Sequence, residues 1–249
     1  MKRCGIGAAI AAVGFLLAIG AAGAAEVACL CSNALKSVME ELGPQFEKAT
    51  GHKLKAVYGS TGPLKAQIEK GQPFDIAILG VDAIDDLIKA GKLSPDTRAD
   101  IARSGMGVAV RKGAAKPDLG STEAFKQALL NAQTIAYSDG GLSGIYLKAL
   151  LERLGLAEQL NSKIRHGRGG EMVSEGKAEI GLTQVSEILA EPHTELAGPL
   201  PPEIQQYTIF PAAIGTAAAQ AEAGRALLKF LKSPEAATVL RAKGLEPAA

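Results

Sequence analysis

The sequence has no tryptophan, few aromatic residues and only three cysteines among its 249 residues. Cys29 and Cys31 lie two positions apart on one face of an expected strand, a geometry that is unfavourable for a disulfide between them. No Cys-x-x-Cys pair and no cluster of Asp or Glu indicates a metal site. We therefore expect two buried thiols that pack as small hydrophobic groups, and no metal or other cofactor.

Residues 1–24 are interpreted as a secretory signal peptide. Lys2 and Arg3 form its basic start, the segment from Ile6 to Ile19 is apolar and uncharged, and small residues follow up to the cleavage position. The apolar run is long enough to raise a membrane anchor as an alternative. Its later part is mostly alanine and glycine, which favours cleavage. We expect an exported, soluble protein.

The sequence has 27 basic and 26 acidic side chains, so neither charge is in excess. Removal of the leader takes two basic residues away and leaves a net charge of −1. This balance does not indicate a protein that binds nucleic acid or a membrane surface by charge. The 225 remaining residues are enough to bury a full core, as one large or two small domains.

The most informative stretch present is Tyr58–Asp75. It reads as a strand end, a small polar loop at residues 59–62 and a helix that Pro63 opens. The first N–H groups of such a helix have no partner within it and carry a partial positive charge. With the hydroxyls of Ser60 and Thr61, they form a cradle for an oxyanion that needs no lysine or arginine. The alternative is a helix cap that holds no ligand.

Before this stretch and after it, the chain alternates strands with helices. Buried-strand patterns at 26–31, 53–58 and 75–79 are each followed by apolar residues at helical spacing. This βαβαβα order predicts a parallel sheet with helices on both faces. A second unit of the same kind follows from residue 122, with strands expected at 134–137, 163–165 and 179–183.

Two further strands, near 104–111 and 207–214, are expected to link these units. We predict a first lobe of residues 25–106 and 209–249, because the C-terminal helices are too few to form a domain alone, and a second lobe of residues 107–208. In open parallel sheets, ligands bind at the carboxyl ends of the strands, where both units carry polar loops. The two lobes would then face each other across a cleft that closes by hinge motion.

Several segments together resemble a known family. They are GSTGPLKAQIEKGQPFDIAIL from Gly59, SGIYLKALLERLG from Ser143, EGKAEIG from Glu175 and FLKSPEAATVLRAKGLEP from Phe230. The chain resembles the periplasmic solute-binding proteins of ABC importers, of the molybdate-binding type. The resemblance implies an α/β, two-lobed type II periplasmic binding fold with a parallel-sheet core in each lobe and a two-strand hinge. It also implies an oxyanion held by hydroxyls and backbone N–H groups.

The resemblance assigns site residues one by one. Ser60 matches the family's anion-binding serine, with Thr61 beside it, and Ser143 matches the position whose backbone amide faces the anion. The family's first binding serine falls on Leu30, and Ser32 is the nearest hydroxyl. We expect Ser32 to act first as a helix cap and second as a ligand contact. Ser143 could also simply cap its helix.

Two departures concern the second lobe. The family's binding tyrosine falls on Gln184, whose amide could bind a carboxylate or amide ligand. Arg168 lies between glycines, and its guanidinium could grip a carboxylate with two hydrogen bonds, although most such arginines are solvated loop residues. The predicted ligand-binding residues are Ser32, Ser60, Thr61, Ser143, Arg168 and Gln184.

We therefore expect a monomeric periplasmic protein that binds a small oxyanion of the molybdate or tungstate type and delivers it to an ABC permease in the inner membrane. The alternative is a small organic anion on the same fold, for uptake or sensing. Because no histidine stands beside a nucleophile in a catalytic pattern, no enzyme is expected.

Overall fold

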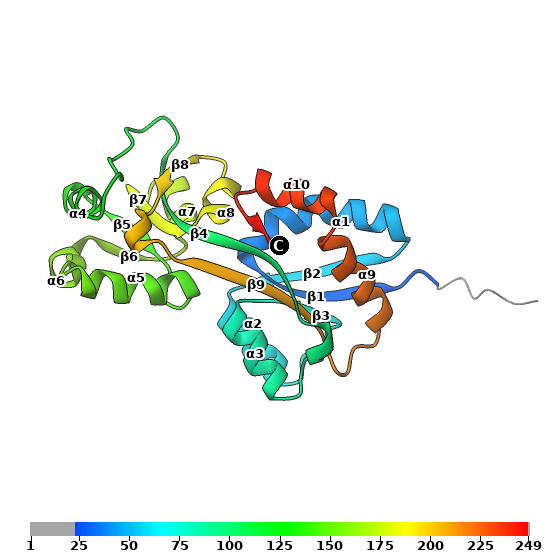
Figure 1. Ribbon diagram of the computed structural model, residues 1–249. Helices are drawn as coiled ribbons and strands as arrows, with labels where there is room; N and C mark the ends of the chain where they lie inside the picture. The colour runs from blue at the N-terminus through cyan, green and yellow to red at the C-terminus, as the bar shows by residue number, and fades with distance from the viewer. Residues whose placement is uncertain (1–22, 249) are drawn as a thin grey trace, which may run out of the picture.

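The computed structural model describes residues 23–248 of the chain (Figure 1). All but the last two residues of the predicted signal peptide lie outside this range. Within it, no helix is both long enough and apolar enough to span a bilayer. The strands form one continuous sheet in the order β2-β1-β3-β9-β4-β7-β5-β6. This sheet passes through two halves of the molecule, each with its own core.

The first half is built on three parallel strands, β1 (Glu26–Ser32), β2 (Lys53–Gly59) and β3 (Ile76–Ile78). Successive side chains of β1 point to opposite faces of the sheet, and buried apolar residues lie on both faces. Helices therefore cover both faces of these strands. The helices are α1 (Lys36–Thr50), α2 (Thr61–Glu69), α3 (Val81–Lys89), α9 (Ala221–Leu231) and α10 (Pro234–Ala242). The last two return from the end of the chain, as the sequence predicts.

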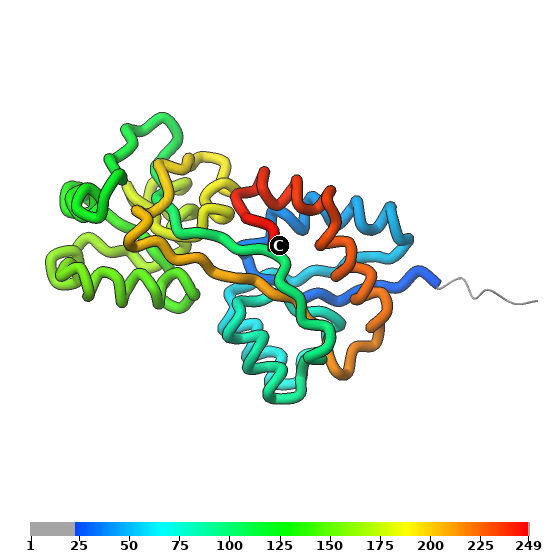
Figure 2. The backbone as a smooth tube through the Cα atoms, viewed as in Figure 1, coloured from blue at the N-terminus to red at the C-terminus, as the bar shows by residue number. Residues whose placement is uncertain are grey.

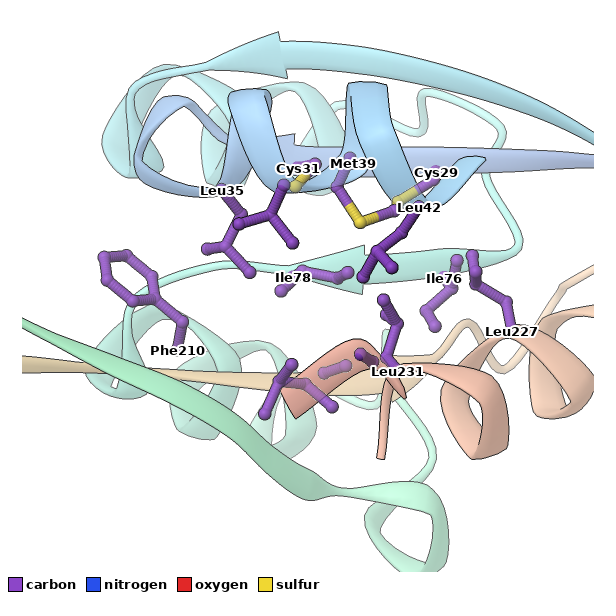
Figure 3. Close-up of a cluster of buried hydrophobic side chains, with 14 of the residues drawn as sticks. Cys29, Cys31, Leu35, Met39, Leu42, Ile76, Ile78, Phe210, Leu227 and Leu231 are labelled. Atoms are coloured by element: carbon purple, nitrogen blue, oxygen red, sulfur yellow. The ribbon is translucent and has the colours of Figure 1, made fainter. Parts of the chain in front are cut away.

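One face of β1 explains the two cysteines. Cys29 and Cys31 are buried, free thiols that pack with Met39 of α1 and Leu227 of α9 (Figure 3). The opposite face turns Leu30 toward α2 and α3. A hydrogen bond with Cys29 and burial raise the pKa of the Cys31 thiol well above its ordinary value, which keeps it protonated. The prediction that these residues act as small hydrophobic groups is confirmed.

The second half has the parallel strands β6 (Ile164–His166), β5 (Ile135–Tyr137) and β7 (Ile180–Gln184), with β8 (Thr194–Pro199) pairing against β4. Its core is separate and is centred on residues such as Phe125, Leu147 and Leu182. Its helices are α4 (Thr122–Asn131), α5 (Leu142–Arg153), α6 (Ala157–Leu160), α7 (Gly169–Ser174) and α8 (Val185–Ala190).

Two antiparallel strands connect the halves, β4 (Ala99–Arg111) and β9 (Tyr207–Ile214). Figure 2 shows them running side by side from one half to the other. The first part of β4, up to Gly105, pairs with β9, and its second part pairs with β7 and β8. The predicted two-strand hinge is confirmed. The predicted lobe boundaries at 106/107 and 208/209 fall within β4 and β9, respectively. They stay a prediction.

Three details of the structure differ from the predicted elements. β4 begins at Ala99 rather than 104, because its first residues pair with the return strand β9. The sequence analysis names no element between β7 and β9, where the structure holds α8 and β8. Helix α2 begins at Thr61 rather than at Pro63, and Leu64 N–H donates to Ser60 carbonyl oxygen at 3.2 Å. The proline therefore lies within the first turn, where its missing N–H removes no helical bond.

The remaining elements are short. Four 3-10 helices and one two-residue strand complete the described chain: η1 (Asn33–Leu35), η2 (Pro95–Thr97), η3 (Asn161–Lys163), η4 (Pro202–Ile204) and β10 (Glu246–Pro247). β10 pairs with β4 in the first half. The chain end is thereby joined to the strand that crosses between the halves.

Candidate functional site

A small cavity of about 50 Å³ lies between the two halves, at the carboxyl ends of β1, β2, β5 and β7. All six predicted site residues line it: Ser32, Ser60, Thr61, Ser143, Arg168 and Gln184. We refer to it as the interlobe cavity. A wider hollow of about 940 Å³ lies on the second half, between residues 111–118 and α4, and none of the six lines it. The structure therefore brings the predicted residues of both lobes to one site.

On the side of the first half, three residues with hydroxyl side chains line the interlobe cavity. Ser32 is buried, and its Oγ accepts from Ala34 N–H at 3.4 Å, so it caps η1 as predicted. Ser60 is the N-cap residue of α2, but its side chain makes no capping hydrogen bond. Thr61 Oγ1 accepts from Gly80 N–H at 3.2 Å. The Thr61 hydroxyl proton is left to donate elsewhere.

On the side of the second half, α5 begins at the cavity. Its N-cap residue is Gly141, and no side chain caps it. The alternative that Ser143 caps this helix is therefore wrong, because Ser143 is the second helical residue and lies buried at the cavity wall. The N-termini of α2 and α5 both meet the cavity, one from each half. Their unpaired N–H groups and partial positive charge favour an anion there.

Gln184 is the last residue of β7 and the N-cap residue of α8. Its Nε2 donates to Thr208 Oγ1 on β9 at 2.8 Å. Its Oε1 is buried and has no hydrogen-bond partner among the described residues. A buried carbonyl oxygen without a donor carries a desolvation cost, which a ligand with an N–H or O–H group would offset.

Arg168 stands at the N-cap of α7, where its Nε donates to Glu171 Oε2 at 2.6 Å. This ion pair raises the pKa of Arg168 and lowers the pKa of Glu171. Arg168 is half exposed and also lines a second cavity of about 300 Å³, together with Lys36, Glu40 and Glu191. We refer to this as the side cavity. A ligand that binds Arg168 would have to share it with Glu171.

The sequence analysis missed Glu187, which comes from α8 and lines both cavities. Its carboxyl accepts a hydrogen bond from the Thr183 hydroxyl. Burial raises the pKa of Glu187, against the opposing effects of that hydrogen bond and the Arg168 charge. The sequence signal was weak, because α8 is too short to show helical periodicity. Only the spacing of Thr183 and Glu187, four apart across a strand end, pointed to a contact.

Within residues 23–248, no group of three or more His, Cys, Asp and Glu side chains is arranged to hold a metal ion. The donors around the interlobe cavity are hydroxyls, helix N–H groups, the amides of Asn33 and Gln184 and the guanidinium of Arg168. This set suits a small anion rather than a cation.

Comparison with known proteins decides the family. The model described as "Bacterial extracellular solute-binding protein" matches residues 27–246. The chain belongs to this family. This solute-binding protein is 35% identical over 227 residues to the aconitate isomerase of Pseudomonas sp, which covers 88% of this chain and 86% of that protein. It is 29% identical over 248 residues to the molybdate-binding protein ModA of Azotobacter vinelandii, covering 94% and 95%.

A solved structure has the same fold. The Azotobacter vinelandii periplasmic molybdate-binding protein matches with a TM-score of 0.75 and 22% identity, over 89% of this chain and 99% of that chain. The resemblance to molybdate-binding-type proteins and the predicted two-lobed α/β fold are therefore confirmed. Most of these relatives are named as binding proteins, and one is named as an enzyme.

Proposed function

We propose that this protein is the periplasmic solute-binding component of an ABC importer and that it holds a small anion in the interlobe cavity. The observation that carries the proposal is the convergence of Ser32, Ser60 and Thr61 from one half with Ser143, Arg168 and Gln184 from the other on one space. Binding there closes the halves on each other, and the closed form is the one that a permease recognises. The mechanism is capture and release, without chemistry.

The first ligand candidate is an oxyanion of the molybdate or tungstate type. Hydroxyls and two helix N-termini supply donors without a full counter-charge, which suits an ion whose charge is spread over several oxygens. The interlobe cavity of about 50 Å³ is far below the roughly 300 Å³ at which pockets for larger ligands begin. The relatives named as molybdate-binding proteins support this ligand class.

The second ligand candidate is a small organic anion. The side cavity of about 300 Å³ adjoins the interlobe cavity and shares Asn33, Arg168, Thr183 and Glu187 with it. Together the two spaces have room for a carboxylic acid of several carbons, with Arg168 near one end. The relative named aconitate isomerase supports this class.

A second function, isomerisation of an unsaturated carboxylic acid, is favoured by Glu187. A carboxylate at this position would take a proton from the methylene carbon beside the double bond and return it to the far carbon of the resulting allylic anion. The atoms balance, because the proton removed is the proton returned and only the double bond moves. Raising the pKa of a carboxyl by burial makes its carboxylate a stronger base.

The export and assembly of the protein are part of the proposal. The leader at residues 1–24 would be cleaved on export to the periplasm, and the mature chain would act as a monomer beside its permease. A sensor that presents its closed form to a receptor is the alternative to transport. Adjacent genes for a permease and an ATPase would favour transport, and their absence would favour sensing.

A thermal-shift panel tests the binding function, with molybdate, tungstate, sulfate and a set of organic acids. One anion class should stabilise the mature chain strongly, since a ligand at 100 times its Kd adds about 2.7 kcal/mol. If no anion raises the Tm, the proposal is wrong. Nuclear magnetic resonance of cis- and trans-aconitate in D₂O tests the second function. Interconversion that Glu187→Gln abolishes would support it, and unchanged spectra would reject it.

A further inference from the structure

The interlobe cavity carries two hydrogen-bond acceptors beside its donors. Gln184 Oε1 is buried without a partner among the described residues, and the Glu187 carboxyl lines the same space. Both come from the end of β7 and the first turn of α8, in the second half. A site for a fully ionised oxyanion needs donors only, so these two groups call for an explanation.

A fully ionised oxyanion would meet these acceptors poorly. Sulfate and molybdate carry no N–H or O–H group, so Gln184 Oε1 would stay without a donor, at the cost of its desolvation. The same ion would face the Glu187 carboxyl, and it could bind only if that carboxyl held its proton. A ligand that brings its own O–H group avoids both penalties.

The charged groups around Glu187 leave its charge only partly balanced. Arg168 is the cation that lowers the pKa of Glu187, but its Nε already donates to Glu171. Glu191 acts in the opposite direction and disfavours ionisation. Across the side cavity, Lys36 and Glu40 of α1 face the same space. Their ion pair, at 3.8 Å, makes a small net contribution.

We propose that the natural ligand is a small anion that carries a hydroxyl or a retained acid proton, and that Glu187 and Gln184 are the residues that select it. This inference rests on the proposed binding function and names the ligand class within it. The donor-bearing part of the ligand lies against α8, and its ionised part lies at the N-termini of α2 and α5. The side cavity then receives whatever carbon chain the ligand has.

Matched ligand pairs test the inference by isothermal titration calorimetry on the mature chain at pH 7.5. Malate and succinate differ by one hydroxyl, as do citrate and propane-1,2,3-tricarboxylate. Phosphate retains an acid proton at this pH, whereas sulfate has none. In any pair that binds, the donor-bearing member should bind about tenfold more tightly or better, which is the loss expected for one hydrogen bond to a charged group.

Glu187→Gln separates the role of this carboxyl from the rest of the site. An amide can donate as well as accept, so the preference should shrink to less than about threefold, chiefly because the ionised member binds more tightly. Glu175→Gln is the matched control, since Glu175 is exposed and lines neither cavity. It should keep the wild-type preference.

A wild-type pH series gives a second readout that needs no variant. The affinity for sulfate, which stays fully ionised from pH 5.5 to 8, should fall as the pH rises and Glu187 loses its proton, while the affinity for malate should change less. Equal or tighter binding of molybdate, tungstate or sulfate at pH 7.5 would overturn the inference and leave the binding function intact. If no anion binds at any pH, the proposed function fails, and the inference fails with it.

Discussion

Gly80 of the first half lies directly against Leu142 of the second half. A Cβ atom added to Gly80 would lie 2.4 Å from Leu142 Cδ1, closer than any real contact. Gly80 is the N-cap residue of α3, and Leu142 is the first residue of α5. Leu142 also lines the interlobe cavity. The contact between the halves and the wall of the site are therefore formed by the same side chain.

Gly80→Val should weaken anion binding by about tenfold or more, because its side chain would hold the halves apart. The backbone of Gly80 has φ −60°, which valine adopts readily, so the cost of the substitution lies in the contact with Leu142. Combining it with Leu142→Ala should recover part of the affinity, since the alanine makes room. Calorimetry on the single and double variants measures this coupling. An unchanged affinity in Gly80→Val would mean that ligand binding does not require this contact.

Ser60→Ala and Ser121→Ala should have opposite effects. Ser60 makes no capping bond, so its loss should leave the free energy of unfolding nearly unchanged and weaken anion binding by about fivefold. Ser121 caps α4 by accepting from Ala124 N–H at 3.1 Å, so its loss should cost about 1 kcal/mol of stability and leave affinity unchanged. Urea denaturation and calorimetry together check both. If Ser60→Ala lowers the stability and leaves the affinity unchanged, Ser60 stabilises helix α2 and does not bind the ligand.

Gly144→Ala should destabilise the second half. A Cβ at this position would lie 1.5 Å from the carbonyl oxygen of Ser138, in the loop that leads to α5. That backbone atom cannot move aside easily, so we expect a loss of about 3 kcal/mol in urea denaturation. Gly140→Ala is the control, because its Cβ would meet nothing within 4 Å. Equal stability of the two variants would contradict the packing of this loop.

Glu187→Gln should change how stability depends on pH. Burial raises the pKa of Glu187 in the folded chain above its ordinary value of 4.5. As the pH rises from 4.5 to the folded pKa, the unfolded chain loses this proton first, so the wild type loses stability across that range. The variant lacks this loss, so its Tm should gain on the wild type from pH 4.5 upward.

Glu123→Gln provides the contrast for this experiment. Lys126 and Gln127 lower the pKa of the Glu123 carboxyl, which is exposed. Any pH dependence removed there would have the opposite sign and a small size, because the pair is screened by solvent. A Tm difference between Glu187→Gln and wild type that stays constant with pH would contradict the raised pKa.

Asp75→Asn should destabilise the first half. Asp75 is buried, and its two oxygens accept from Ala28 N–H and Gln220 N–H, each at 2.8 Å. It therefore joins β1 to the start of α9. An amide must turn its NH₂ group toward one of these donors, with an expected cost of about 2 kcal/mol in urea denaturation. Asp82→Asn, on the exposed face of α3, should cost less than about 1 kcal/mol.

The sequence could place the candidate site's hydroxyls at one edge of the sheet because a general rule connects them. Ser32 ends β1 and Ser60 directly follows β2, and parallel strands end at the same edge of a sheet. Their meeting with Ser143 across the halves follows from the two-lobed fold, which the family resemblance supplied. Leu30 at the family's serine position packs into the core, as its apolar side chain requires.

Contacts between segments that are distant in the chain could not be predicted from the sequence. Gln184 bonds to Thr208, 24 residues away, and nothing local indicates that pairing. Glu187 stands on a six-residue helix that has no periodicity to detect. The Arg168–Glu171 ion pair could be anticipated from its spacing of three, but the effect of Arg168 on Glu187 depends on how α7 and α8 pack. Tertiary packing, rather than local preference, decides these positions.

A crystal structure of the mature chain with its best-binding anion is the most direct test of the account. We predict ligand density in the interlobe cavity, with ligand atoms within about 3.2 Å of polar atoms from both Ser60 and Ser143. A ligand that touches only one half, or that binds outside this cavity, would contradict the account.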